Sequence, residues 1–334
     1  MPGVTLHLVL VHRVLEHWMD APGDAPFDPH TPVFTNAFYQ GAFGPDLGYF
    51  PGGTRLLSEL SHLVGSGDLT RTLVWGARTP LERAFSWGWA THVLADRCIH
   101  PLIGRAVGEL VYGNRSVLAD AAQHQIPHIQ VETGLDAFYS HLFPDLRKRK
   151  MTSVFDGDSI RFLTEAYRKV YSLRLDPSVF LASHLATARM SVQGLITIGA
   201  LSTALIHKPV PPAVAGTRWF LQGALALMKA GLARDSLLKA LLNPIPPTEW
   251  LLEKVERRVG RFADRFLRLY RSNLRDLPNY NLDTGRVQDR PPTHPGTLWA
   301  LKTLARKGGR VPSEPEKTSP VGAVSGPLPS GAHV

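Results

Sequence analysis

The sequence predicts an all-α protein. Apolar residues recur at three- and four-residue spacing along most of the 334-residue chain, whereas strand-like alternation of apolar and polar residues is rare. Prolines stand near the expected first position of two helical segments, where the missing N–H costs nothing. Hydrophobic residues make up 44% of the chain, which is ample for a buried core in a protein of this length.

The N-terminal segment "MPGVTLHLVLVHRVLEHW" is apolar but is interrupted by His7, His12 and Arg13. No basic region precedes it, so we expect no signal peptide. No uninterrupted apolar run reaches the roughly 20 residues that span a bilayer. The nearest, residues 190–206, is predicted to be a buried helix, with contact to a membrane as the alternative. The single cysteine, Cys98, excludes an internal disulfide framework and favours a reducing, cytoplasmic compartment.

Residues 20–53 are rich in Pro, Gly and Asp and are predicted to form an ordered loop region. Within it, "GAFGPDLGYF" places Asp46 in a Gly/Pro turn between apolar residues, where an acid can be held rigidly. The next segment, residues 54–67, has leucines at helical spacing and ends at glycines, which predicts a helix.

The helix that follows has the clearest boundary signals in the chain. Thr79 is placed as its N-cap, Pro80 as its first residue, and Glu82 completes a capping box. Pro101 is predicted to end this helix at or just before His100, because proline disfavours helical backbone in the residue before it.

Further helical segments are expected to begin near Pro127 and to occupy 158–172, 188–206, 216–231, 234–242 and 247–274. In the last of these, an apolar stripe is expected to be buried and four arginines to face water: Val255, Val259, Phe262, Phe266 and Leu269, and Arg257, Arg261, Arg265 and Arg268. We divide the chain into a metal-binding core (1–150), a helical extension packed on it (151–306) and a disordered, Pro/Gly/Ser-rich tail (307–334).

The formal net charge of +9 favours anionic partners, such as phospholipid surfaces, nucleic acid or phosphorylated substrates. "RKRK" (147–150) and the basic helix within 253–276 are expected to be solvated, with contact to an anionic membrane as the alternative. The chain has no recognisable nucleic-acid-binding motif, so nucleic acid is expected only as a substrate.

A polar stripe interrupts the apolar stretch "SWGWATHVLADRCIHP" (86–101). His92, Asp96 and His100 are each four residues apart and therefore share one helix face. Their apolar neighbours indicate that this face is at least partly buried. Buried imidazole and carboxylate groups need partners, and a divalent metal such as zinc is one.

Other residues of the same kind strengthen this interpretation. His128 and Glu132 form a second pair at four-residue spacing, and Asp46, His62 and His7 lie in or beside apolar segments. Five histidines and three acids within residues 7–132 predict a metal cluster. A helical scaffold that is stabilised by metal but not catalytic stays open as an alternative.

In this order, these residues resemble the zinc-dependent phospholipase C family, which is related to the fungal single-strand nucleases. The motifs are an early His7, "GAFGPD" with Asp46, a helical His62, "HVLAD" with His92 and Asp96, then His100, and "HIQVE" with His128 and Glu132. The resemblance covers roughly residues 2–145, and "LPNYNLDTG" (277–285) is similar to a late segment of bacterial members. The gap between Asp96 and His100 is shorter than in the secreted bacterial enzymes.

The resemblance implies a multi-helix phospholipase C/nuclease-like domain with a helical C-terminal extension and two or three zinc ions. In the family pattern, one ion is held by Asp46, His62, His92 and Asp96, a second by His100, His128 and Glu132, and a third by His7, Asp96 and the N-terminal amine. Because Pro2 is small, we expect Met1 to be removed, and we hypothesise that the Pro2 amine is that last ligand.

The implied activity is phosphoester hydrolysis, in which a zinc cluster activates water for attack on phosphorus. A phospholipid substrate would give diacylglycerol and a phosphorylated headgroup; the alternative is a nuclease- or nucleotidase-like phosphoesterase. Asp46 is the candidate catalytic residue, since an acid in a rigid turn can orient or deprotonate the water. Asp136 is expected to be a solvated acid or, alternatively, to fix a ligand histidine. Tyr49 is expected to pack or to contact phosphate, and Asp283 to be a turn or cap residue.

Overall fold

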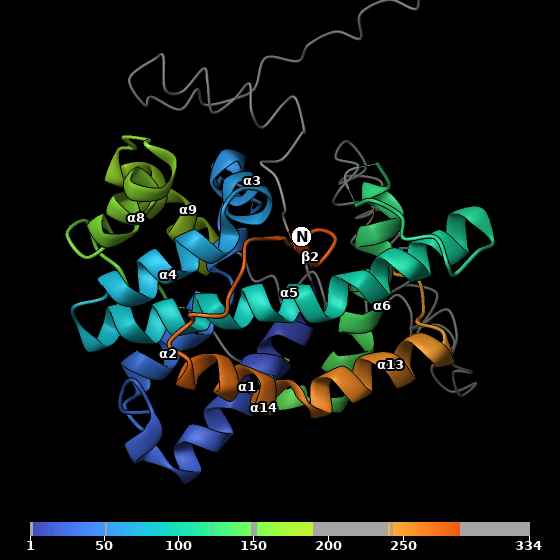
Figure 1. Ribbon diagram of the computed structural model, residues 1–334, viewed down its shortest axis with the longest axis horizontal. Coiled ribbons are helices and arrows are strands. Elements are labelled where there is room, and N and C mark those ends of the chain that lie inside the picture. The colour runs from blue at the N-terminus through green and yellow to red at the C-terminus, as the bar shows by residue number, and fades with distance from the viewer. Residues whose placement is uncertain are drawn as a thin grey trace, which may run out of the picture.

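The computed structural model describes residues 3–50, 52–121, 123–147, 152–189, 240 and 243–287 (Figure 1). The helices in these ranges are α1 (Val4–Asp20), α2 (Pro32–Gly41), α3 (Arg55–Leu63), α4 (Ser66–Gly76), α5 (Pro80–Tyr112), α6 (Gln125–Leu142), α7 (Pro144–Arg147), α8 (Arg161–Tyr171), α9 (Pro177–Arg189), α13 (Glu249–Gly260) and α14 (Phe262–Arg271), with 3₁₀ turns η1 (Pro22–Asp24) and η2 (Gly44–Asp46). The only strands among the described residues, β1 (Tyr280–Asn281) and β2 (Arg286–Val287), form one antiparallel hairpin. The all-α prediction is confirmed.

Helix α5 is the central element of the fold. It is 33 residues long and runs through the molecule in Figure 1, with α1, α2, α4, α6, α13 and α14 packed along it. Trp89, Val93 and Val107 on this helix are almost completely buried. A side chain on the buried face of α5 is therefore surrounded by other helices and kept away from water.

The start of α5 is as predicted, but its end is not. The Thr79 hydroxyl accepts a hydrogen bond from the Glu82 backbone N–H, and the Glu82 carboxylate accepts one from Thr79 N–H. The helix then continues through Pro101 to Tyr112. A proline inside a helix costs about 3 kcal/mol. Burying Ile103 and other apolar side chains beyond it stabilises the helix by roughly 1.5–3 kcal/mol each, which offsets that cost.

The loop predicted over residues 20–53 is wrong in part, because this region contains α2 and both 3₁₀ turns. Helix α2 crosses α5 with the two backbones in contact at Gly41 and Gly88. A Cβ atom on Gly41 would lie 2.0 Å from the carbonyl oxygen of Phe85, and one on Gly88 would lie 2.1 Å from that of Phe38. Gly41, which looked like a loop residue, and Gly88 are what this close helix contact requires.

The single helix predicted over 247–274 is divided into α13 and α14 at Arg261, whose backbone leaves the helical region at φ −106° and ψ 4°. Gly260, a weak helix former, stands just before this break. The predicted apolar stripe is buried at Val255, Phe262 and Phe266, and Leu269 is partly buried. Phe266 packs on Trp18 of α1, with ring centroids 5.8 Å apart.

Several predicted segments lie wholly or almost wholly outside the described residues: the helices at 188–206, 216–231 and 234–242, the basic run 147–150 and the tail 307–334. Among the helices that the structure describes, none combines the length and hydropathy needed to cross a membrane.

Candidate metal centre

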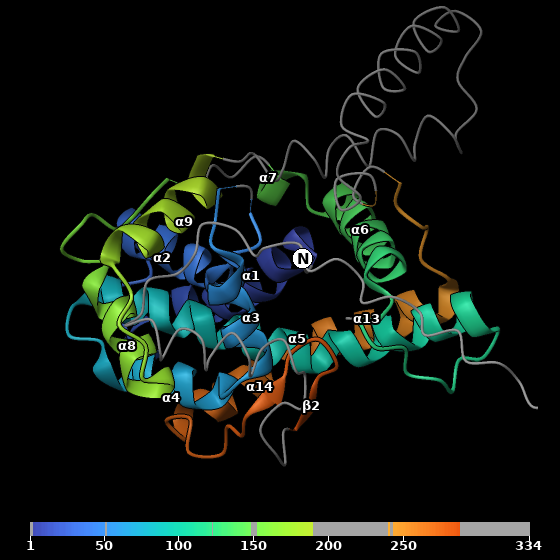
Figure 2. The same cartoon turned by 90° about the horizontal axis from the view of Figure 1, so that it is seen from above.

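Five elements bring the predicted site residues together. The residues come from α1 (His7), η2 (Asp46), α3 (His62), α5 (His92, Asp96 and His100) and α6 (His128 and Glu132). Figure 2 looks onto the side of the molecule where α1, α3, α5 and α6 converge. Each of the eight residues is at most 6% exposed. The structure thus gathers all eight predicted residues in one buried region.

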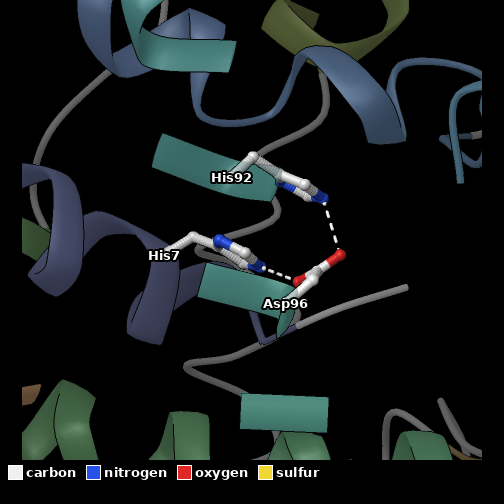
Figure 3. Close-up of side chains that lie close together, drawn as sticks. All are labelled: His7, His92 and Asp96. Carbon is white, nitrogen blue, oxygen red and sulfur yellow. Dashed lines mark ion pairs between the residues drawn. The ribbon is translucent and has the colours of Figure 1, made fainter. Parts of the chain in front are cut away.

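Asp96 lies at the centre of this region. Its Oδ1 is 3.1 Å from His7 Nε2 and its Oδ2 is 3.0 Å from His92 Nε2 (Figure 3). The same carboxylate lies 3.4 Å from His100 Nε2 and 3.7 Å from His62 Nε2. The His7 and His92 rings stack with centroids 4.2 Å apart. Four imidazoles therefore face one carboxylate.

Asp46, His62 and His92 form the first group of potential ligands. Asp46 Oδ1 is 3.3 Å from His62 Nε2, and Asp46 Oδ2 is 3.9 Å from His92 Nδ1. The outer nitrogen of each histidine ring, Nδ1, is the one that is not a potential metal ligand, and it has a backbone acceptor. His62 Nδ1 lies 2.8 Å from Ser58 O, and His92 Nδ1 lies 2.7 Å from Ala42 O. Donation to these carbonyls places the protons on Nδ1 and leaves the Nε2 lone pairs free for a metal.

His100, His128 and Glu132 form the second group. His100 Nε2 is 3.1 Å and His128 Nε2 is 3.0 Å from Glu132 Oε1. In contrast to the first group, the outer Nδ1 atoms of both rings are buried and have no hydrogen-bond partner among the described residues.

The charges at this site depend on one another. Burial alone would lower the pKa of His100, but the carboxylates of Asp96 and Glu132 raise it to about 10. Burial would raise the pKa of Asp96, yet His100 and His92 hold it well below its usual range. The pKa of Glu132 is lowered against burial by His128 and His100. Both acids are therefore ionised at neutral pH and available to a cation.

The unsatisfied atoms of the site show that its residues fit a metal. Within the part of the chain that the structure describes, these buried atoms have no hydrogen-bond partner: Asp46 Oδ1, His62 Nε2, His92 Nε2, both oxygens of Asp96, His100 Nδ1, His128 Nδ1 and Glu132 Oε2. Several of these atoms meet one another in ion-pair contacts that lack hydrogen-bond geometry, and leaving buried polar atoms without hydrogen bonds is costly.

The ligand atoms form three groups, each within 4.8 Å of one another: His7/His92/Asp96, Asp46/His62/His92 and His100/His128/Glu132. Imidazole nitrogen with carboxylate oxygen is a common ligand set for zinc. The N-terminal amine of Pro2, the hypothesised further ligand, lies outside the described residues.

Comparison with known proteins identifies the group to which this arrangement belongs. The family model for zinc-dependent phospholipase C matches residues 6–175, which is over half of the chain. The chain belongs to the zinc-dependent phospholipase C family. No curated protein and no solved structure matches it. All eight residues of the candidate metal centre of this phospholipase C family member lie within the matched segment, whereas the β1–β2 hairpin lies beyond it.

Asp136 is buried and accepts hydrogen bonds from the start of α1 rather than from a ligand histidine, so both expectations for it are wrong. Its Oδ1 accepts a hydrogen bond from the Leu6 backbone N–H at 3.0 Å, in the first turn of α1. Burial raises the pKa of Asp136 to about 8 against these backbone hydrogen bonds. The carboxyl group thus holds the start of the helix that carries His7, because the first N–H groups of a helix have no partner within it.

Tyr49 lies beside the candidate metal centre, and the charge of Asp283 acts on it. The Tyr49 ring is 5.3 Å from that of His62, and burial together with the charge of Asp283 raises the Tyr49 pKa well above 10. Asp283 is in the turn of the β1–β2 hairpin, as expected. The sequence alone gave no reason to place that turn at the site; the similarity of "LPNYNLDTG" to a late family segment was the available signal.

Proposed function

We propose that this protein is a zinc-dependent phosphoester hydrolase of the phospholipase C type and that a phospholipid is its substrate. The observation that supports this most strongly is the convergence of four imidazoles on the buried Asp96 carboxylate, within the segment matched to the family. Zinc, when bound, lowers the pKa of water and neutralises charge that develops on the phosphoester.

The residues that would hold the metal follow from the groups described above. Asp46, His62 and His92 would hold one ion, and His100, His128 and Glu132 a second. Asp96 would bind the first ion and would also bind a third ion together with His7, because its Oδ2 faces His92 and its Oδ1 faces His7. We therefore propose two or three zinc ions per chain.

Asp46 is the proposed catalytic residue. The η2 turn fixes its backbone, because Asp46 N–H donates to Phe43 O at 3.0 Å, and the neighbouring Pro45 carbonyl accepts from the Ser61 hydroxyl at 3.0 Å. Asp46 Oδ1 has no hydrogen-bond partner among the described residues and can accept a proton from water. As the water oxygen bonds to phosphorus, the bond from phosphorus to the diacylglycerol oxygen breaks, and that oxygen takes up a proton.

Apolar residues line a cavity next to part of the proposed metal site, which does not include Asp46. The cavity that contains His7, Asp96, His100 and Glu132 is otherwise lined by Gly3, Leu6, Leu10, Ala95, Ile99, Ile103 and Leu135. These walls keep bulk water away and lower the local dielectric constant, so that charges held in the cavity act more strongly on the phosphate.

We also propose that the exposed arginines of α13 and α14 contact anionic lipid at a membrane surface. Arg257, Arg261 and Arg268 are exposed on these helices, opposite the buried apolar stripe. Sedimentation with vesicles of phosphatidylcholine alone and with added phosphatidylglycerol tests this. Binding that is equal for both vesicles, or unchanged in an Arg261→Glu/Arg268→Glu variant, would exclude it. The cytoplasmic location expected from Cys98 stays a prediction.

The experiment for the proposed function compares substrates and metal states. Zinc-loaded protein is expected to release phosphocholine from phosphatidylcholine, to lose this activity in EDTA and to regain it with added zinc. Preferential cleavage of a nucleotide phosphoester would instead favour the nuclease-like alternative. Zinc-dependent thermal stability without either activity would favour a non-catalytic scaffold.

A further inference from the structure

The β1–β2 hairpin lies outside the family match, yet it is held against the helices that carry the metal ligands. Leu282 N–H donates a hydrogen bond to the carbonyl oxygen of His62 at 2.9 Å, and the Leu282 side chain is fully buried. Tyr280 donates its N–H to Ser66 Oγ and accepts from the same hydroxyl, both at 2.8 Å. One side of the hairpin is therefore fixed on α3 and the start of α4.

The other side of the hairpin is fixed on α5 at Pro101. Because Pro101 has no N–H, the carbonyl of Arg97 lacks the usual helical hydrogen bond at this point. Gly285 packs there with φ +66°, and a Cβ on it would lie 2.7 Å from Pro101 Cδ and 2.9 Å from Arg97 O. The Arg97 guanidinium lies 5.3 Å from the centroid of the Tyr280 ring. Asp283 thus stands between an anchor on His62 and an anchor beside His100.

The two groups of ligands differ in how their outer ring nitrogens are satisfied. His62 and His92 each have a backbone carbonyl within 2.8 Å of Nδ1, whereas His100 Nδ1 is buried and unpaired among the described residues. After burial, Asp96 and Glu132, the charge of Asp283 is a further cause of the His100 pKa shift, and it also acts on Tyr49. Because the hairpin is anchored at His62 on one side and at Pro101 on the other, its turn holds Asp283 next to the helices that carry the predicted ligands.

We propose that Asp283 is a positioning residue for the second metal group and that its carboxylate accepts the Nδ1–H of His100 through one bridging water. The inference rests on the proposed function, because it concerns His100 with zinc on Nε2. A ring that binds zinc through Nε2 keeps its proton on Nδ1, and that donor needs an acceptor. The hairpin supplies the carboxylate that α5 and α6 do not.

The test measures zinc affinity in the full-length chain. Zinc is withdrawn from Asp283→Ala with the chelator 4-(2-pyridylazo)resorcinol, and Asp276→Ala serves as the control, since Asp276 is an exposed carboxylate in the same C-terminal segment. One zinc of Asp283→Ala is expected to bind about 10- to 100-fold more weakly, and the others as in the wild type. Asp283→Asn keeps an acceptor oxygen and is expected to restore part of the affinity.

Two further measurements separate positioning from a purely structural role. The loss of affinity in Asp283→Ala should be confined to one zinc and partly restored in Asp283→Asn, whereas a purely structural role would weaken every zinc alike and would not be rescued. Gly285→Ala, which displaces the hairpin from Pro101, should weaken the same zinc.

Equal zinc affinity in Asp283→Ala and Asp276→Ala would overturn the proposal. So would equal weakening of every zinc with no rescue in Asp283→Asn. Fewer than two zinc ions in the wild type would instead contradict the proposed function.

Discussion

Replacing Gly88 by alanine tests the link between helix packing and the metal centre. An added Cβ would lie 2.1 Å from the carbonyl oxygen of Phe38 and 2.9 Å from the Cα of Gly41. Both neighbours are backbone atoms of α2, so no side-chain rotation relieves the clash. Helix α2 must move away from α5.

The size of the effect follows from these distances. A carbon–oxygen contact normally needs about 3.3 Å, so α2 must shift by about 1 Å. Overpacking of this kind costs about 1–3 kcal/mol, and we expect the upper end because two backbones are in contact. Ala42, just after α2, accepts from His92 Nδ1 at 2.7 Å. A shift of about 1 Å would break that hydrogen bond and weaken zinc binding by about 10- to 100-fold.

Urea unfolding in EDTA gives the free energy of unfolding, and chelator competition gives the zinc affinity. Gly76→Ala is the matched control, because an added Cβ there meets nothing within 4 Å. That variant should be stabilised by up to about 1 kcal/mol, with unchanged zinc affinity. A Gly88→Ala protein as stable as Gly76→Ala, or with wild-type zinc affinity, would refute this reasoning.

Asp96→Ala should lower zinc content and activity more than His7→Ala, because Asp96 faces four imidazoles; equal losses by elemental analysis and phosphatidylcholine hydrolysis would contradict this. Burial lowers the pKa of His184 from 6.5 to about 4. As the pH is lowered, His184 therefore takes up a proton in the unfolded chain before it does so in the folded protein. The free energy of unfolding in EDTA should fall by up to about 3 kcal/mol as the pH drops from about 6.5 to 4. His184→Gln should remove this dependence in urea unfolding, and an unchanged pH profile would exclude His184 as its source. Mass spectrometry should show that Met1 is absent; retained Met1 with full zinc occupancy would exclude Pro2 as a ligand.

Local signals predicted parts of the fold well. The start of α5 follows from Thr79 and Glu82, whose hydrogen bonds involve only neighbouring residues. The end of α5 could not be predicted. Its residues beyond Pro101 are buried against elements that are distant in the sequence, and this burial outweighs the local effect of proline. Helix α2 was missed for a similar reason: its glycine is explained only by Gly88, far along the chain. The domain boundaries at 150 and 306 stay predictions.

The candidate site was likewise predicted where local spacing determines it and missed where tertiary packing does. Four-residue spacing placed His92, Asp96 and His100 on one face of α5, and the structure keeps them together. His7 and His62, on other elements, were singled out as histidines in or beside apolar segments. Only the resemblance assigned them to particular ions, because spacing along the chain does not show which helices meet. The backbone acceptors of the ligand rings and the place of the hairpin turn depend on tertiary packing and were not predicted. That these residues bind zinc stays a prediction.

The most direct test of the central claim is the zinc content of the purified full-length protein, measured by elemental analysis. Two or three zinc ions per chain are expected, falling to fewer than two in Asp96→Ala, whose side chain is shared between groups. Fewer than two zinc ions in the wild type, or an Asp96→Ala variant with the wild-type zinc content, would contradict a zinc cluster built around Asp96.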